Sequence, residues 1–450
     1  MRVLLAGAPL DDPEVYDQSI PNLGLYLLAS IVMKHGHEVE VLDQSQFTGK
    51  LGDLESAREE VRGFDVVGIS ATTASWPHAR RLAYDLDGME ERPFLVLGGA
   101  HGSILDEHVI LSSPFDFVVR GEGERTFVSL LDLINKREDA RELPGITYKK
   151  KGRAVRTENS RLLTSEEMET LPLPAYGLMP RGHYDRIAVE SSRGCYNACV
   201  FCSIPYARKW RGIGASCFIK RMEDLSSHVE NSRTGSFYII DDCFTADTER
   251  VRKVAEELSA FPHPFNCEAR VPDMLEDGVA RALAATPLSV VEMGVECGYD
   301  EGLEKVGKRI KISDVDRVAE VVNDVGLAER ARFSFVLGLP WEGKKEVMKT
   351  IEYAMKLGER TGASIIFSWL TVYPGSRIWN KRDEWGIKIS PETYDTPGWY
   401  NSEELFRHCH PKIDPDTDGV EIATYAKMLM KVMPGLKVEG ALQYLMEEDG

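Results

Sequence analysis

The chain has 450 residues, of which 72 are acidic and 54 are basic, so its net charge is −18. This balance disfavours nucleic acid as a partner, because a protein that binds a phosphate backbone needs a basic face. With 43% hydrophobic and 28% charged residues, the chain can bury several cores, which excludes disorder over most of its length. No apolar run approaches the ~20 residues of a membrane span, and the N-terminus resembles a first strand and not a secretion signal. We therefore expect about three folded units in a cytoplasmic protein without a membrane partner.

Residues 1–136 alternate between strand and helix patterns. Strands are expected at Val3–Ala6, Glu38–Leu42, Val66–Ser70, Phe94–Gly98 and Asp116–Val119, and helices at Asn22–His35, Asp53–Arg62, Pro77–Leu86 and Glu124–Lys136. The strands are short, continuous apolar runs, which are typical of a parallel sheet covered on both faces. The pattern predicts an α/β fold whose first domain is a doubly wound, Rossmann-like or flavodoxin-like sheet.

Polar or glycine-rich segments follow three of these strands, at residues 70–73, 98–102 and 120–124. Ligands of doubly wound domains bind beyond the carboxyl ends of the strands. Glycine lets a bulky ligand approach the backbone, although glycine also makes ordinary tight turns. Because three such loops share one edge, we expect a large ligand there.

Residues 137–185 are more polar and predict a connector with one hairpin, in which Lys149–Lys151 form the exposed turn. A second alternating series occupies residues 186–385. Strands are expected at Ile187–Glu190, Ser236–Ile240, Phe265–Ala269, Val290–Val295, Arg332–Leu337 and Ile365–Val372, with helices such as Thr248–Leu258 and Ser313–Val325 between them. Six such units predict a partial (β/α)6 barrel of the TIM type, with its chemistry on the loops that follow the strands. Residues 386–450 form a C-terminal extension with a helix near Ile422–Met433.

Three of the eight cysteines fall within eight positions, namely Cys195, Cys199 and Cys202. Structural zinc normally takes four protein ligands, and catalytic zinc is usually bound by histidine and carboxylate, neither of which is interleaved here. Three thiolates on a 4Fe–4S cluster would leave one iron without a protein ligand, open to a substrate or cofactor. These cysteines are therefore the candidate metal ligands and catalytic centre.

The spacing C-x-x-x-C-x-x-C with an aromatic residue at Phe201 resembles the signature of the radical S-adenosylmethionine (SAM) enzymes. The resemblance implies that the thiolates hold a 4Fe–4S cluster whose open iron chelates SAM, and that reduction yields a 5′-deoxyadenosyl radical. It also implies cofactor contacts at the ends of the later strands. Asp241 or Asp242 would accept from the amino group of SAM, Arg270 would face its carboxylate, Glu296 its ribose and Gly338 its adenine, with Phe201 beside the cluster.

A doubly wound domain before such a barrel resembles the cobalamin-binding subfamily of radical SAM enzymes, which includes many methyltransferases. The implied cobalamin contacts are Ser70, Thr72, Gly98, Gly99, His101 and Glu122, with His101 the best candidate to touch the corrinoid. Trp76 would either pack under the macrocycle or belong to the core. The motif Asp-x-His-x-x-Gly is incomplete, because Leu111 stands where the glycine belongs in the segment that starts at Asp106. This fits cobalamin bound without a histidine ligand, and equally a domain that has lost the cofactor.

Three functions remain open from the sequence. The first is cobalamin-dependent methylation of an unactivated carbon in a small metabolite, with two SAM molecules consumed per methyl group. The second is radical dehydration or rearrangement of a polar substrate, such as an aminosugar, without cobalamin. The third is a non-enzymatic iron–sulfur or zinc protein with His183 or Cys217 as a fourth ligand. Both enzymatic functions imply an electron donor such as flavodoxin, ferredoxin or a reductase.

Overall fold

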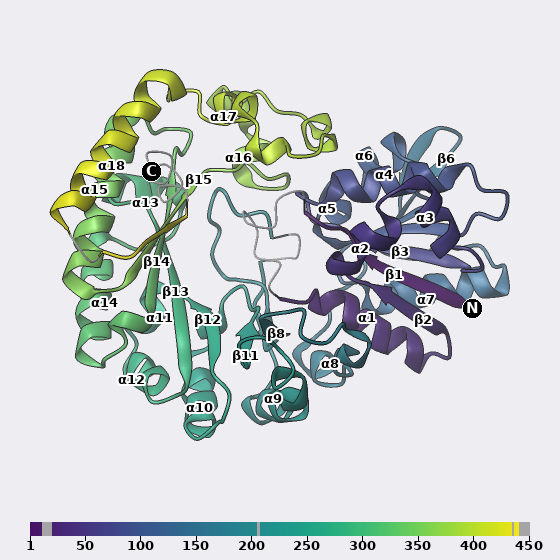
Figure 1. The fold of residues 1–450 in the computed structure, drawn as a ribbon, viewed down its shortest axis with the longest axis horizontal. Helices are drawn as coiled ribbons and strands as arrows, with labels where there is room; N and C mark the ends of the chain where they lie inside the picture. The colour runs from purple at the N-terminus through teal and green to yellow at the C-terminus, as the bar shows by residue number, and fades with distance from the viewer. Residues whose placement is uncertain (11–19, 205–207, 434–435, 441–450) are drawn as a thin grey trace.

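The structure, a computed structural model, describes residues 1–10, 20–204, 208–433 and 436–440. These residues form two seven-stranded sheets that lie side by side, with the first two-fifths of the chain around one sheet and the rest around the other (Figure 1). A two-stranded ladder lies in the second part of the chain. The fold class expected from the sequence is therefore confirmed.

The first sheet has the strand order β2-β1-β3-β4-β5-β6-β7. Its strands are β1 (Arg2–Gly7), β2 (Glu38–Leu42), β3 (Val66–Ser70), β4 (Phe94–Gly98), β5 (Phe117–Val119), β6 (Ile146–Lys150) and β7 (Arg153–Arg156). Strands β1 to β5 are parallel, and the order reverses between β1 and β3, as in flavodoxin-like sheets. The helices are α1 (Leu23–Lys34), α2 (Gln44–Leu51), α3 (Leu54–Glu60), α4 (Trp76–Asp87), α5 (Gly99–Ile104), α6 (Asp106–Ser112) and α7 (Gly123–Lys136).

Two features of this domain differ from the sequence prediction. The hairpin expected in the connector exists, but β6 pairs antiparallel with β5, so the sheet continues to Arg156 and is not wholly parallel. Helices α2, α5 and α6 were not predicted. Two of the six residues of α5, Gly99–Ile104, are glycine, so its helical propensity is low and packing must stabilise it.

The second sheet has the order β16-β15-β14-β13-β12-β11-β8. Its strands are β8 (Arg186–Val189), β11 (Ser236–Ile239), β12 (Phe265–Ala269), β13 (Leu288–Glu296), β14 (Ala331–Leu337), β15 (Ser364–Trp369) and β16 (Val438–Gly440). All neighbours are parallel and all seven strands follow chain order, the first six as a partial (β/α)6 barrel requires. The seventh strand, β16, was not predicted. Helices α8 (Ser165–Glu169), α9 (Ala215–Val229), α10 (Thr248–Leu258), α11 (Val271–Met274), α12 (Val279–Ala284), α13 (Asp300–Val306), α14 (Ile312–Asp324) and α15 (Lys344–Thr361) precede and connect these strands.

The C-terminal extension joins the two halves. Helices α16 (Arg377–Asn380) and α17 (Glu403–Cys409) lie on the side of the barrel nearest the first domain, and α18 (Val420–Val432), close to the predicted helix, packs on α15 (Figure 1). The Trp76 indole donates to the Asp395 carboxylate at 2.7 Å, and the Trp399 indole donates to the Thr73 carbonyl at 3.3 Å. The extension therefore ties the barrel to the first domain.

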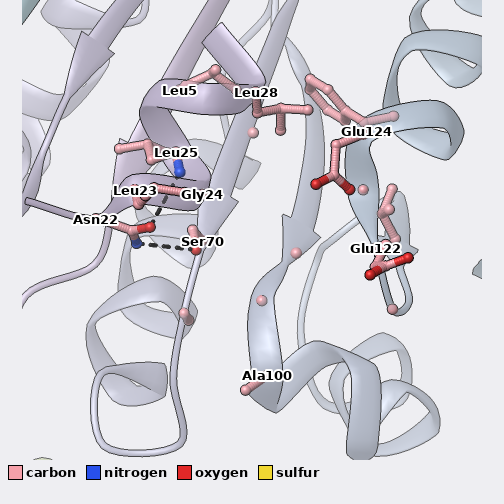
Figure 2. A pocket seen from close by; sticks show the side chains of 18 of the residues that line it. Leu5, Asn22, Leu23, Gly24, Leu25, Leu28, Ser70, Ala100, Glu122 and Glu124 are labelled. Atoms are coloured by element: carbon pink, nitrogen blue, oxygen red, sulfur yellow. Dashed lines mark hydrogen bonds between the residues drawn. The ribbon is translucent and has the colours of Figure 1, made fainter. Parts of the chain in front are cut away.

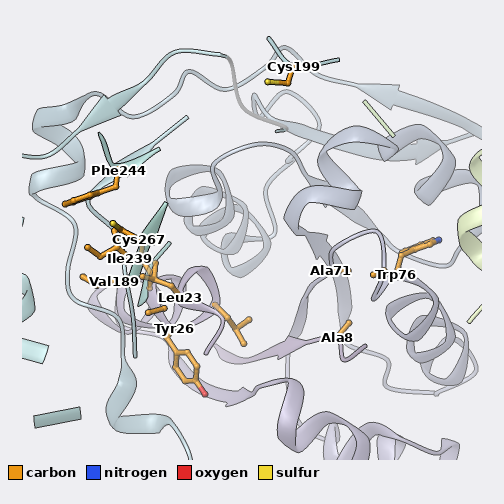
Figure 3. Close-up of a cluster of buried hydrophobic side chains, with 14 of the residues drawn as sticks. Ala8, Leu23, Tyr26, Ala71, Trp76, Val189, Cys199, Ile239, Phe244 and Cys267 are labelled. Carbon is orange, nitrogen blue, oxygen red and sulfur yellow. The ribbon is translucent and has the colours of Figure 1, made fainter. Parts of the chain in front are cut away.

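Buried apolar side chains run without interruption from one sheet to the other, and Figure 3 shows part of this core with Leu23 and Tyr26 beside Val189 and Ile239. Tyr26 and Tyr184 both donate to the buried carboxylate of Asp43, at 2.5 and 2.6 Å. These contacts place the two sheets in one fixed relation. No helix among the described residues is long and apolar enough to cross a membrane.

Candidate functional site

The three cysteines lie on one loop that follows β8. The loop is closed at its base by the antiparallel ladder β9 (Ser192–Arg193) and β10 (Arg211–Gly212). Its middle is anchored on both sides, because Val200 N–H donates to the Val306 carbonyl at 3.0 Å and the Val200 carbonyl accepts from Ile378 N–H at 3.0 Å. The cysteines are consequently held against the barrel and are not on a free loop.

Two neighbouring aspartates at the end of β11 hold the start of this loop. Asp241 accepts from the backbone N–H and hydroxyl of Ser191 and from the hydroxyl of Ser192, so both of its oxygens are engaged. Asp242 accepts from Gly194 N–H at 2.8 Å, and burial, together with the charge of Asp241, raises the pKa of its carboxyl. The sequence could not distinguish the two aspartates. The structure gives Asp241 a positioning role, which leaves Asp242 as the better candidate to contact SAM.

Glu296 ends β13 in the left-handed region, at φ 79°, where a residue with a side chain is strained. Its carboxylate is paired with the buried ammonium of Lys308, which also lies close enough to Cys199 and Cys195 to interact electrostatically with both thiols. Burial raises the pKa of the Cys199 thiol to about 11, and the charge of Lys308 opposes this rise. The sequence identified Glu296 but gave no signal for Lys308.

The donor set fits an iron–sulfur cluster better than one metal ion. The three thiols interact electrostatically with one another, yet no three Cys, His, Asp or Glu side chains in the described part of the chain are placed to coordinate a single ion. A zinc site needs all its ligands around one atom, whereas a cluster takes each cysteine on a different iron. His183 packs against Tyr184, and Cys217 lies on α9, so neither completes a zinc site. The residues present fit a 4Fe–4S cluster.

A cavity of about 380 Å³ lies between the two sheets, beyond the carboxyl ends of β3, β4 and β5 (Figure 2). The first domain contributes the predicted residues Ser70, Thr72, Gly98, Gly99 and Glu122, and the barrel contributes Glu190, Ser192, Arg193, Ile240 and Asp242. Asn22 lies in its wall, where the side chain caps α1 by accepting from Leu25 N–H and points its amide toward Ser70 (Figure 2). The cavity therefore reaches from the switch point of the first sheet to the base of the cysteine loop.

Glycine makes room for a flat ligand in this cavity. A Cβ atom built on Gly98 or Gly121 would meet no atom within 4 Å, so a side chain at either position would have open space to fill. The deeper wall is apolar and contains Leu5, Leu28 and Phe127. An apolar wall with a glycine-rich rim suits contact with the flat face of the cobalamin macrocycle.

Arg193 connects this cavity to the cysteine loop. Its buried guanidinium contacts Glu122 at 3.1 Å and Glu124 at 2.7 Å, both in the first domain, and Glu190 at 2.8 Å in the barrel. Arg211, across the ladder, contacts Glu122 at 2.8 Å. Sequence reasoning missed both arginines, because nothing in a single sequence states which carboxylates an arginine will meet.

Comparison with known proteins agrees with this geometry. Residues 14–131 match the family model of the B12 binding domain, and residues 189–354 match that of the radical SAM superfamily. An uncharacterized methyltransferase of Pyrococcus horikoshii is 30% identical over 84% of this chain and 82% of its own length. The chain belongs to the radical SAM superfamily, among the members that carry a B12-binding domain. Its family cofactors are a 4Fe–4S cluster, SAM and cobalamin.

Two further proteins are similar to this radical SAM protein. The hopanoid C-3 methylase of Methylococcus capsulatus is 23% identical over 80% of the chain and 68% of its own length. The radical SAM methyltransferase TsrM of Kitasatospora setae, solved with cobalamin and a 4Fe–4S cluster, superimposes with a TM-score of 0.67 at 18% identity. That likeness covers 87% of this chain and 79% of TsrM, and it shows a common two-domain fold.

One of the six predicted cobalamin residues, His101, lies away from the cavity. His101 is fully buried in α5, stacks on Trp76 at 4.8 Å between ring centroids and is absent from the cavity wall. Burial lowers the pKa of its imidazole to about 3, so the ring is neutral. The structure thus gives His101 and Trp76 a core position behind the rim. His108, of the incomplete motif, contacts Asp395 at 3.1 Å and is also absent from the cavity wall.

The other predicted SAM residues are placed as follows. The Arg270 guanidinium is bound to the Asp273 carboxylate, which raises the pKa of Arg270, and lies 5.9 Å from the Tyr196 ring centre on the cysteine loop. Gly338 has φ 75°, and a Cβ there would come within 2.3 Å of the His410 ring, so glycine is required by packing. Phe201 is partly buried beside Cys202. Contact of these residues with SAM stays a prediction.

Proposed function

We propose that this radical SAM protein is a cobalamin-dependent methyltransferase that adds a methyl group to an unactivated carbon of a small molecule. When bound, the cluster with SAM supplies a 5′-deoxyadenosyl radical, and cobalamin supplies a transferable methyl group. A radical is needed because such a carbon has no acidic proton for a general base to remove. The names of the relatives and of the structural neighbour, several of which are methyltransferases, support the same reaction class.

One observation carries the proposal: a single cavity is walled by the strand-end loops of the B12-type domain and by residues at the base of the cysteine loop. Ser192, Arg193 and Asp242 lie at that base, and Ser70 and Gly98 lie across the cavity from them. A domain that had kept its fold and lost its cofactor would not need to preserve such a cavity. Radical chemistry and methyl donation would therefore occur next to each other.

The residues of the chain have distinct tasks in this reaction. Cys195, Cys199 and Cys202 hold the cluster, and Lys308 places a positive charge beside two of these thiols. Asp242 and Glu296 orient SAM, while Asp241 positions the loop. The cluster receives its electron from a donor such as flavodoxin, ferredoxin or a reductase.

The test is an anaerobic product analysis of the reconstituted protein with SAM and a strong reductant. We expect S-adenosylhomocysteine and 5′-deoxyadenosine to form when hydroxocobalamin is present, and S-adenosylhomocysteine to disappear when it is omitted. Formation of 5′-deoxyadenosine alone in both cases would favour radical dehydration or rearrangement over methyl transfer. Formation of neither product by a protein with full iron content would contradict an enzymatic role. The matched control is Cys199→Ala, which should yield no 5′-deoxyadenosine.

A further inference from the structure

A second cavity, of about 920 Å³, lies on the other side of the segment that contains Gly121. It is bounded by the N-terminal domain at Ser103 and Arg120, by residues 156–166 of the connector, and by Lys209–Arg211 of the barrel. The two cavities share Gly121, so the second cavity adjoins the proposed cobalamin site. The proposed methyl transfer assigns no role to this second cavity.

This cavity is cationic in a protein that is strongly anionic. Its described walls contain Arg120, Arg156, Arg161, Lys209 and Arg211 against one carboxylate, Glu166. The chain as a whole has a net charge of −18, so a local excess of cations is not a consequence of composition. A concave surface lined by one sign of charge concentrates ligands of the opposite sign.

Carboxylates behind the walls hold these arginines in place. Asp106 contacts Arg156 at 2.9 Å and Arg120 at 3.6 Å, and Glu122 contacts Arg211 at 2.8 Å. The side chains of both carboxylates are only 3% exposed, so they lie in the protein interior and not in the cavity. They neutralise part of the charge. Arg120 also donates to the Asn159 side chain and to the carbonyls of Ile146 and Thr157, so the donors left for a ligand are mainly those of Arg156 and Arg211, each a guanidinium with five N–H groups.

Several guanidinium nitrogens of these arginines make no hydrogen bond with any described residue. Nε and Nη2 of Arg211 and Nε of Arg120 are buried and make no hydrogen bond in the described part of the chain. The ammonium of Lys209 is exposed and has no ion pair with any described residue. Buried donors are nearly always satisfied, so these guanidinium groups keep hydrogen-bonding capacity for an acceptor. Guanidinium groups match the oxygens of phosphate or phosphonate in bidentate geometry.

We propose that this cavity binds a phosphate or phosphonate group of the substrate, which would anchor one end of the molecule while another part reaches the radical. The inference rests on the proposed function for the identity of that substrate, but the anion site can be tested without turnover. The same oxyanion chemistry also occurs in the phosphodiester of cobalamin, and the experiment must separate the two sources.

The experiment is a calorimetric titration of inorganic phosphate into the reconstituted protein, with and without bound cobalamin, at constant ionic strength set by chloride. The variant Arg161→Gln/Lys209→Gln removes two exposed charges from the cavity, of which Arg161 is paired with Glu167 outside the cavity wall. The variant Arg141→Gln/Lys253→Gln is the matched control, because it removes the same charge from exposed ion pairs elsewhere. We expect at least tenfold weaker phosphate binding in the cavity variant and less than twofold change in the control.

Equal weakening in both variants would overturn the proposal, because binding would then follow net charge alone. Loss of phosphate binding when cobalamin is loaded would also overturn it, since the anion site would belong to the cofactor. Failure of the proposed function has a different signature. Phosphate would still bind to the cavity, but S-adenosylhomocysteine would not form when cobalamin is present.

Discussion

Arg193 is the side chain whose loss should weaken the link between the two halves most. Its guanidinium makes three contacts of 2.7–3.1 Å with Glu122, Glu124 and Glu190, and the side chain is 9% exposed. Arg193→Met would leave three buried carboxylates without this cation. Removing one partner of a buried ion pair costs about 3–5 kcal/mol. Since about 1.4 kcal/mol is a factor of ten, the unfolded fraction should rise by roughly two to four orders of magnitude.

The assay is urea unfolding, with the midpoint and slope of the transition followed by circular dichroism and tryptophan fluorescence. Arg141→Met is the control, because Arg141 pairs with Asp139 at the surface, where solvent screens the interaction, and we expect no change in the midpoint. Burial already raises the pKa of Glu190, and Arg193 opposes this rise. A carboxyl whose pKa is raised in the folded state binds its proton more tightly there than in the unfolded state, so stability falls as the pH rises through that pKa. The variant should therefore be least stable relative to wild type at neutral and alkaline pH. Equal midpoints for the two variants would refute the role of Arg193 in holding the two halves together.

Three other changes test separate parts of the site. Gly98→Val should weaken cobalamin binding at least tenfold in an absorption titration, while Gly49→Val on the surface should not, because only the first side chain enters the cavity. Asp241→Asn should lower the iron content after reconstitution by releasing Ser191, and unchanged iron content would count against its positioning role. Burial raises the pKa of Glu342 to about 7 from an ordinary value near 4.5, so wild-type stability should fall by about 3 kcal/mol between pH 5 and pH 8. Glu342→Gln should remove that part of the pH dependence of unfolding. An unchanged pH profile would refute the assignment of this dependence to Glu342.

The sequence predicted most of the fold because hydrophobic patterning is a local signal. The strands Val66–Ser70, Phe94–Gly98 and Phe265–Ala269 have the predicted limits. The first two are short apolar runs between polar segments, and the third alternates apolar and polar residues. Helix α5 was missed because its glycines favour a loop, and tertiary packing overrides that preference. Strand β16 has only three residues, too few for a periodic pattern.

The candidate site could be predicted only where the spacing of residues along the sequence indicates a particular chemistry. The spacing of the three cysteines predicted the cluster site, and the glycines after the strands predicted a ligand site at that edge of the first sheet. The partners of Arg193 and Lys308 depend on which distant side chains the fold brings together, and no local pattern encodes this. His101 shows the opposite error: its place in a glycine-rich segment suggested a ligand contact, but the segment folds into a helix that turns the ring into the core.

The central claim is that a corrinoid occupies the cavity between the two sheets. The most direct measurement is the corrinoid-to-protein ratio after anaerobic loading with hydroxocobalamin and gel filtration, read from the absorption spectrum. The structure predicts one corrinoid per chain in the wild-type protein and a strongly reduced ratio in Gly98→Val, with the same cluster iron content in both. A corrinoid that elutes entirely with the small molecules, from a protein fully loaded with cluster, would contradict it.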